Sequence, residues 1–188
     1  MILNVKSGGS TVSEQRIGVV YNIPPEPPKE ANTKWFPAGA ITIGLEYRDL
    51  DPESLHDLYK DNPEHLKEML EKAPEGGFTD EGVSIHVRGT TDGHEYLRFD
   101  VFDGEPHYHY VFNSPETINN VVVFDTLAHG DMMPFAFHCL RHRLAEMLPR
   151  ALGGDLVDQL DETLINKVVD EVQVLAVKAQ ADMRSARV

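Results

Sequence analysis

Strict alternation of apolar and polar positions marks two runs on either side of Asp103-Gly104. Asp-Gly is the residue pair typical of a type I′ hairpin turn, because both turn positions need positive φ. A turn at this point pairs Asp100 with His107 on the neighbouring strand. Since successive side chains of a strand point to opposite faces, the hairpin has one apolar and one polar face. The apolar face carries Leu97, Phe99, Val101, Tyr108, Tyr110 and Phe112, and the polar face carries Tyr96, Arg98, Asp100, His107 and His109.

The same alternation predicts strands over residues 17–21, 41–47 and 83–87. A five-residue loop after the last of these would place His86 opposite Tyr96. Residues 118–124 differ, because apolar side chains fall on both of their faces. This doubly apolar strand indicates that part of the polar face is covered as well. A covered polar face forms a pocket rather than a wet surface.

Helix signals follow the cap-then-proline rule at Asp51-Pro52 and Asn62-Pro63, which predict helices over 52–60 and 63–73. A further helix is predicted over 133–148, with Pro134 in its first turn and an apolar stripe along one side.

The last predicted helix is capped by Asp155, and its apolar stripe runs from Val157 to Ala179. About 28 residues at 1.5 Å each would reach roughly 42 Å, which is longer than a domain of this size needs. We therefore expect part of this helix to contact another subunit, so that the protein is a homo-oligomer through its C-terminal helix.

Taken together, these elements predict an α+β fold: a mainly antiparallel twisted sheet of about six strands, packed by helices and followed by the long helix. The alternative is a helix-grip arrangement, in which a curved sheet wraps the long helix. With 188 residues the chain is long enough for one well-buried core. The predicted organisation is a polar arm over 1–16, one domain over 17–152 and a helical extension over 153–188.

The formal net charge of −14 is spread evenly along the chain. Residues 1–94 hold 9 basic and 16 acidic side chains and residues 95–188 hold 8 and 15, which is a net charge of −7 in each half. No basic stripe is present, so nucleic acid and anionic membrane are poor partners. The single cysteine, Cys139, excludes an intramolecular disulfide and fits a reducing compartment. No leader or membrane-spanning run is evident, and we expect a cytoplasmic protein.

The His-x-His pair formed by His107 and His109 is the main candidate site. Two imidazoles on one face of a strand, roughly 7 Å apart along the backbone, can converge on one divalent ion such as zinc. The third ligand would be His86, with Asp100 or Glu46 as alternatives. Asp100 could instead orient His107 through its second ring nitrogen.

The same residues also support readings without a metal. In an acid–base site, Asp100 would polarise His107 or His109, and Arg98 would hold an anionic group. Tyr96 and Tyr108 are the candidate ligand-binding aromatics. A pocket that binds a small molecule without turnover, or an ordinary cross-strand ion pair on a half-wet face, fits equally well. The sequence therefore leaves enzymatic activity and cofactor undetermined.

His138 and His142, at i and i+4 on the predicted helix, could also chelate zinc. They lack the glutamate of a His-Glu-x-x-His protease motif. A solvated helix face or a subunit contact is the simpler interpretation.

The segment from Arg98 through Leu152 resembles an uncharacterised bacterial family defined only as a domain of unknown function. The resemblance rests on the Pro-His-Tyr-His-Tyr strand at 106–110, on Asp125, on Gly130-Asp131 and on the Leu-Arg-His-Arg-Leu run at 140–144. It implies no activity and transfers no catalytic residue.

Overall fold

The computed structural model describes residues 20–22, 27–50, 63, 67, 80–114 and 117–186. The predicted arm over 1–16 lies outside these residues. Of the helices predicted over 52–60 and 63–73, only Pro63 and Lys67 are described, and both are helical.

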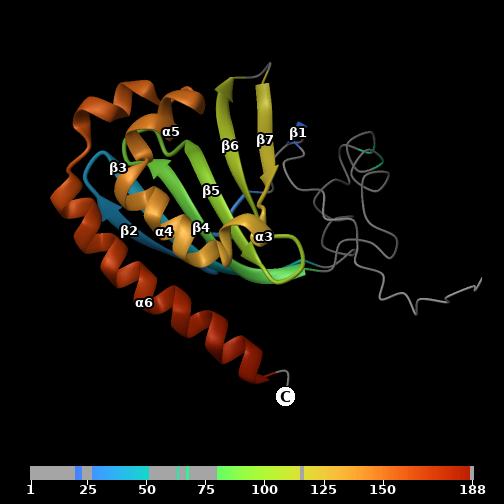
Figure 1. Ribbon diagram of the computed structural model, residues 1–188. Coiled ribbons are helices and arrows are strands. Elements are labelled where there is room, and N and C mark those ends of the chain that lie inside the picture. Colours follow the sequence, from blue (N-terminus) through green and yellow to red (C-terminus); the bar gives the residue numbers. More distant parts are fainter. Residues whose placement is uncertain are drawn as a thin grey trace, which may run out of the picture.

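Seven antiparallel strands form a single sheet in the order β1-β7-β6-β5-β4-β3-β2. Apart from β1, each strand pairs with its neighbour in sequence, so the sheet is a meander (Figure 1). The strands are β1 Val20–Asn22, β2 Thr33–Ala38, β3 Ile41–Leu50, β4 Asp80–Gly89, β5 Glu95–Phe102, β6 His107–Ser114 and β7 Thr117–Val123.

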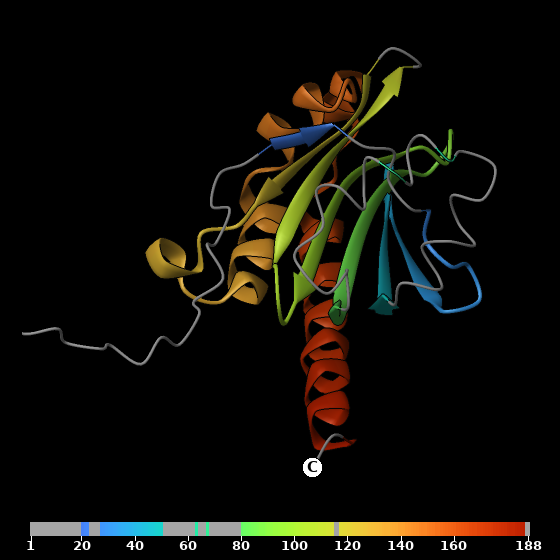
Figure 2. The same cartoon turned by 90° about the vertical axis from the view of Figure 1, so that its right-hand side faces the viewer.

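The helices that come after β7 in sequence cover one face of the sheet (Figures 1 and 2). They are α3 Thr126–His129, α4 Met132–His142, α5 Leu144–Arg150, the 3-10 helix η1 Gly154–Gln159 and α6 Glu162–Ala186. The predicted α+β class is confirmed, including the antiparallel sheet and the long C-terminal helix.

Two helix predictions need correction. The helix predicted over 133–148 divides at Arg143, whose backbone leaves the helical region with φ −129° and ψ 0°. Asp155 lies in the 3-10 helix rather than at the start of the long one. The first turn of α6 is capped instead by the Asp161 carboxylate, which accepts a hydrogen bond from the Leu164 amide at 2.9 Å.

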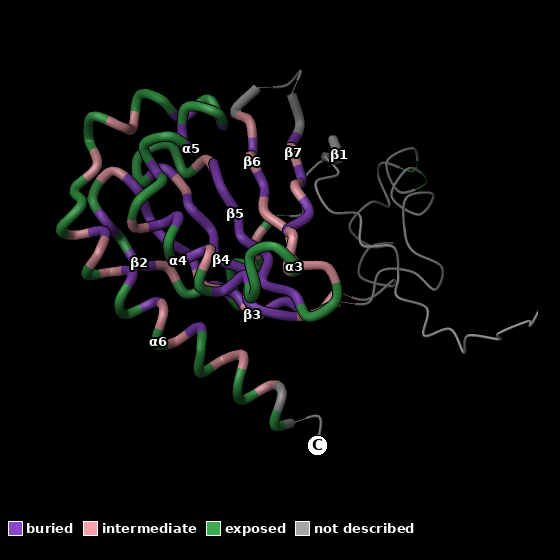
Figure 3. Tube along the Cα trace, viewed as in Figure 1, coloured by how far each residue is buried: buried purple, intermediate pink, exposed green. Residues whose placement is uncertain are grey.

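The packing between the sheet and α6 is apolar, as the alternating pattern predicts. The buried strand residues Ile43, Ile85, Val87, Leu97 and Phe99 have no exposed surface. Against them α6 places Ile165, Val169, Val172 and Ala176, which are buried. Figure 3 shows this core in purple and the C-terminal part of α6 largely exposed.

Strand β2, which the alternating pattern does not reveal, contains Pro37. A proline donates no hydrogen bond to a sheet and is tolerated on an edge strand. Strand β2 is the edge, since it pairs only with β3. Pro37 therefore hides the strand from sequence analysis without preventing it from forming.

The hairpin register is confirmed: Asp100 pairs with His107, and Arg98 pairs with His109. The predicted type I′ turn is wrong, because neither Asp103 nor Gly104 has positive φ. The turn is stabilised by a residue outside the hairpin, since the Asp80 carboxylate accepts hydrogen bonds from the amides of Gly104 and Glu105 at 2.9 and 2.8 Å. The register thus depends on cross-strand packing and on a residue of β4.

Candidate functional site

Two neighbouring rows of side chains cross the face of the sheet that points away from the helices. One row joins His86 on β4, Arg98 on β5 and His109 on β6, and the next joins Ser84, Asp100 and His107 on the same strands. The predicted pairing of β4 with β5 was displaced by two residues, since His86 lies opposite Arg98 rather than Tyr96. A shift of two keeps every residue on its face. The polar face therefore forms as expected, with different neighbours.

An irregularity in pairing between Val87 and Arg88 changes one member of this face. Val87 pairs with Leu97 while Arg88 pairs with Glu95, so that Tyr96 is the extra residue of a bulge. Tyr96 is buried in the apolar core, where its ring leaves no room for a side chain at Gly153. The expected place of Tyr96 on the polar face was wrong. Glu95, which the alternating pattern left out, contacts that face instead.

The first cluster, here called the Glu95 group, consists of Glu46, Arg48, His86, Glu95 and Arg98. Glu95 accepts two hydrogen bonds from Arg98, at 2.9 Å from Nε and 2.5 Å from Nη2. Its Oε1 also lies 2.6 Å from Nδ1 of His86. Although burial would raise the pKa of the Glu95 carboxyl, the Arg98 guanidinium and His86 hold it well below its usual range.

On the other side of the imidazole, Nε2 of His86 lies 3.2 Å from Oε2 of Glu46, within ion-pair distance. The angle at these atoms is not that of a hydrogen bond, so both remain without a hydrogen-bond partner although both side chains are fully buried. Arg48 adds a second cation at 3.7 Å from the same Glu46 oxygen. In the Glu95 group each carboxylate therefore faces an arginine as well as the histidine.

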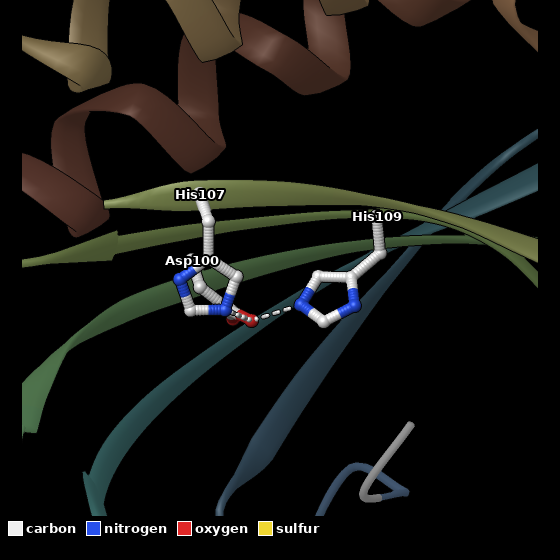
Figure 4. A group of neighbouring side chains, drawn as sticks. All are labelled: Asp100, His107 and His109. Atoms are coloured by element: carbon white, nitrogen blue, oxygen red, sulfur yellow. Dashed lines mark hydrogen bonds and ion pairs between the residues drawn. The ribbon is translucent and has the colours of Figure 1, made fainter. Parts of the chain in front are cut away.

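The second cluster, here called the Asp100 group, consists of Ser84, Asp100, His107, His109 and Asn119. Figure 4 shows both imidazoles extending from β6 toward the Asp100 carboxylate of β5, on the side of the sheet away from the helices. A single oxygen, Oδ2 of Asp100, lies 3.2 Å from Nε2 of His107 and 2.8 Å from Nε2 of His109. The other carboxylate oxygen accepts a short hydrogen bond from the Ser84 hydroxyl.

The remaining ring nitrogens are also held. Nδ1 of His107 donates to the Glu105 carbonyl oxygen at 2.7 Å, which directs Nε2 at Asp100. Nδ1 of His109 lies 3.2 Å from Oδ1 and 3.0 Å from Nδ2 of Asn119. The amide of Asn119 can therefore either accept from this nitrogen or donate to it. Nδ1 of His109 therefore has a hydrogen-bond partner in either tautomer of the ring.

Burial and charge separate the protonation of the two histidines. Burial opposes a positive charge on His107, but its contact with the Asp100 carboxylate prevails and raises the pKa of His107 above its usual value. For His109 burial prevails, and together with the charges of His107 and Arg98 it lowers the pKa to about 4. The same contacts hold the pKa of Asp100 well below its usual range, despite its burial. His107 therefore keeps its proton to a higher pH than an isolated histidine does, whereas His109 is the neutral imidazole of the pair at neutral pH.

A set of three possible metal ligands arises in this cluster alone among the described residues. One ligand atom each from Asp100, His107 and His109 lies within 4.8 Å of the other two. Two histidines and one carboxylate are a donor set that holds divalent transition-metal ions and leaves coordination positions open. The third position beside the histidine pair is thus filled by Asp100, while both nitrogens of His86, the expected third ligand, face carboxylates of the Glu95 group.

The other predicted site residues lie apart from this centre. Arg98 is nearly fully buried and its Nε and Nη2 are occupied by Glu95. Tyr108 lies on the helix side of the sheet, where its ring stacks on Phe99 with centroids 6.2 Å apart. Neither Tyr96 nor Tyr108 shares the face of the sheet that carries the two histidines.

A pocket of about 190 Å³ opens at the tip of the hairpin. Its lining includes Phe102, whose ring meets His107 edge-on at 5.5 Å between centroids. The polar side chains of this pocket belong to Asp103, Thr126, Asp131 and Gln180. This lining differs from the histidine- and arginine-lined pocket that the sequence predicts.

Within the part of the chain that the structure describes, no helix has the length and apolar character needed to cross a lipid bilayer.

Comparison with known proteins gives a family and no activity. No curated protein and no solved structure matches the chain. One family profile matches residues 35–176, which include β3 to β7, both buried clusters and most of α6. With this match, which covers well over half of the sequence, the chain belongs to the family described as Domain of unknown function (DUF7700).

Proposed function

We propose that this domain binds one divalent transition-metal ion through Asp100, His107 and His109. The observation that carries the proposal is the convergence of three ligand atoms on one buried point. Oδ2 of Asp100 lies about 3 Å from both Nε2 atoms, as it would if all three were bonded to one ion at about 2.0 to 2.2 Å.

Support also comes from the groups behind the ligands. Metal-bound histidines donate their second ring N–H to a carbonyl or carboxylate, which fixes the tautomer and orients the ring. The Glu105 carbonyl serves this purpose for His107, and Oδ1 of Asn119 can serve it for His109. The Ser84 hydroxyl holds the free oxygen of Asp100. These partners fix each ligand before an ion arrives.

A proton and a metal ion would compete for this centre. When His107 is protonated, the Nε2–H groups of both histidines point at one carboxylate oxygen. Metal binding requires neutral imidazoles, so this protonated form of His107 must release a proton. His109 must carry its proton on Nδ1 instead of Nε2, and Oδ1 of Asn119 then accepts a hydrogen bond from Nδ1–H. Binding would therefore weaken as the pH falls through the pKa of His107.

With the ion we propose a small anionic ligand, on which the protein acts or which it only holds. Three protein ligands leave positions open on a tetrahedral or octahedral ion. With His107 neutral, the charged side chains of the Glu95 and Asp100 groups are the carboxylates of Glu46, Glu95 and Asp100 and the guanidinium groups of Arg48 and Arg98. A divalent ion added to them gives a net charge of +1. A buried net charge is costly, so an anion that completes the coordination is favoured.

Metal titration of chelator-treated protein tests the proposal. In a His142→Ala background, which removes the surface pair of His138 and His142, calorimetry with Zn²⁺ and with Co²⁺ should show one site that is lost when His107→Ala or His109→Ala is added. The control is His129→Ala, which removes an exposed histidine outside the cluster. Binding that persists in both site variants would contradict the proposal.

A second candidate function is self-association through α6. Two apolar side chains on this helix are exposed, Val174 at 69% and Val177 at 52%, and Figure 2 shows α6 extending past the sheet. A second copy would bury these valines. Light scattering across a concentration series decides the question, because a monomer at every concentration would remove the reason for this candidate.

We further propose that the protein works in the cytoplasm. Its one cysteine, Cys139, is a buried free thiol, and burial raises the pKa of this thiol to about 11. A thiol that stays protonated is inert, as suits a reducing compartment.

A further inference from the structure

A second pair of histidines lies on α4, on the side of the sheet opposite the Asp100 group. His138 and His142 are four residues apart and both are exposed. Residues at this spacing are neighbours on a helix surface. Their rings have already converged, with centroids 5.1 Å apart and an angle of 54° between the planes.

The separation of the rings matches two imidazoles on one ion. With metal–nitrogen bonds of about 2.0 to 2.1 Å and tetrahedral angles, two ligating rings have their centres roughly 5 Å apart. The buried pair His107 and His109 has a similar separation of 4.9 Å. Both histidine pairs therefore have a spacing compatible with chelation, one of them in the interior and one at the surface.

Neighbouring side chains leave the surface pair free to bind. In the described part of the chain neither ring has a hydrogen bond or an ion pair, so no partner must be displaced. The nearby cations are already paired: Arg141 reaches α6, where it lies 2.9 Å from Asp170, and Arg143 lies 3.6 Å from Glu146. Their positive charges are thus directed away from the ion or partly compensated.

We propose that His138 and His142 form a second, solvent-accessible metal site. Imidazole ligands suit Zn²⁺, Ni²⁺ and Cu²⁺, whereas Mg²⁺ and Ca²⁺ prefer oxygen. Two protein ligands leave at least two coordination positions to solvent or to another molecule. Such a site can therefore share an ion with a chelator immobilised on a resin. The Asp100 group is buried and cannot contact a resin-bound ion.

Retention of the tag-free protein on immobilised Ni²⁺ tests this site separately from the buried one. The parent and His107→Ala should be retained alike, and His142→Ala should elute at a lower imidazole concentration. Loss of the second ligand should weaken binding about tenfold or more, because the first histidine no longer presents it at high effective concentration. His129→Ala, which removes an exposed histidine from α3, is the control and should behave as the parent.

Calorimetry in the His107→Ala background, in which the buried histidine pair is also broken, gives the second readout. There the chain should bind one Cu²⁺ or Ni²⁺ ion through α4 and none after His142→Ala is added. Alanine favours helix more than histidine does, so the variant should keep its fold, which circular dichroism checks. Equal retention of His142→Ala and parent, or unchanged Cu²⁺ binding in the double variant, would overturn the proposal. Neither result bears on the Asp100 group, which has its own variants.

Discussion

The Glu95 group and the Asp100 group lie side by side on one face of the sheet, yet their charges are arranged differently. In the Glu95 group two arginines and a histidine face two carboxylates, and the clamp between Arg98 and Glu95 uses both carboxylate oxygens. In the Asp100 group one carboxylate oxygen serves two imidazoles. In the Glu95 group the cations are therefore arginine side chains, which are always present. In the Asp100 group the position between the carboxylate and the imidazoles can be occupied by a proton or a metal ion. This difference indicates a structural cluster beside a functional one.

Replacing Arg98 with methionine should give the largest loss of stability, because Glu95 would keep a buried charge without its main partner. Removing one member of a buried ion pair costs about 3 to 5 kcal/mol. Urea unfolding measures this loss. Arg143→Met, at an ion pair that is half exposed, should cost no more than about 1 kcal/mol. A comparable effect of the two variants would contradict a structural role for the Glu95 group.

The two histidines of the Asp100 group should show opposite pH dependence when chelator is present. The pKa of His109 falls to about 4 in the folded protein, so between pH 6.5 and 4 the unfolded chain takes up a proton that the folded chain does not. Relative to His109→Gln, the parent should lose about 3 kcal/mol as the pH falls through this window.

For His107 the folded pKa is raised, so its contribution is complete below about pH 6.5 and disappears as the pH rises through the folded pKa. The advantage of the parent over His107→Gln should therefore shrink from pH 6 to pH 9. Unfolding curves at several pH values measure both differences. Parallel profiles for the two variants would mean that the histidines are not distinguished as described.

In a His142→Ala background, which lacks the surface histidine pair, metal-dependent stabilisation should follow the Asp100 group alone. At a free Zn²⁺ concentration one hundred times the dissociation constant, this chain should gain about 2.7 kcal/mol, and the same chain with Asp100→Asn should gain nothing. In a thermal melt this is a rise of roughly 5 to 10 °C. Glu46→Gln, in the neighbouring group, should keep the rise. A metal response lost in Glu46→Gln and kept in Asp100→Asn would exchange the roles of the two clusters.

The smallest effect is expected for Tyr96→Phe. Its hydroxyl donates to the Asp92 carboxylate at 2.7 Å, and loss of this hydrogen bond should cost about 1 kcal/mol. Because Tyr96 lies in the core of the helix side, metal affinity should not change. A metal affinity of Tyr96→Phe that differed from that of the parent in a calorimetric titration would mean that Tyr96 contributes to the metal site.

Sequence pattern alone predicted the pairing of Asp100 with His107, because alternation and the position of the turn determine which residues of a hairpin are opposite. It did not predict the bulge at Tyr96, which depends on how that ring packs against Gly153 more than fifty residues later. Glu95 was missed for the same reason. The support of the hairpin tip by Asp80 was also missed, since it is a contact between residues far apart in sequence.

All three proposed ligands come from one hairpin, within the ten residues from Asp100 to His109. Closing so short a loop costs little entropy, and contacts that are local in sequence form early in folding. Zn²⁺ could therefore bind while the outer strands are still unpaired. In that case the ion would accelerate refolding as well as slow unfolding, and the folding arm of a chevron plot would shift with metal. For this chain the Asp100 group would then be a nucleus from which the sheet grows outward in both directions.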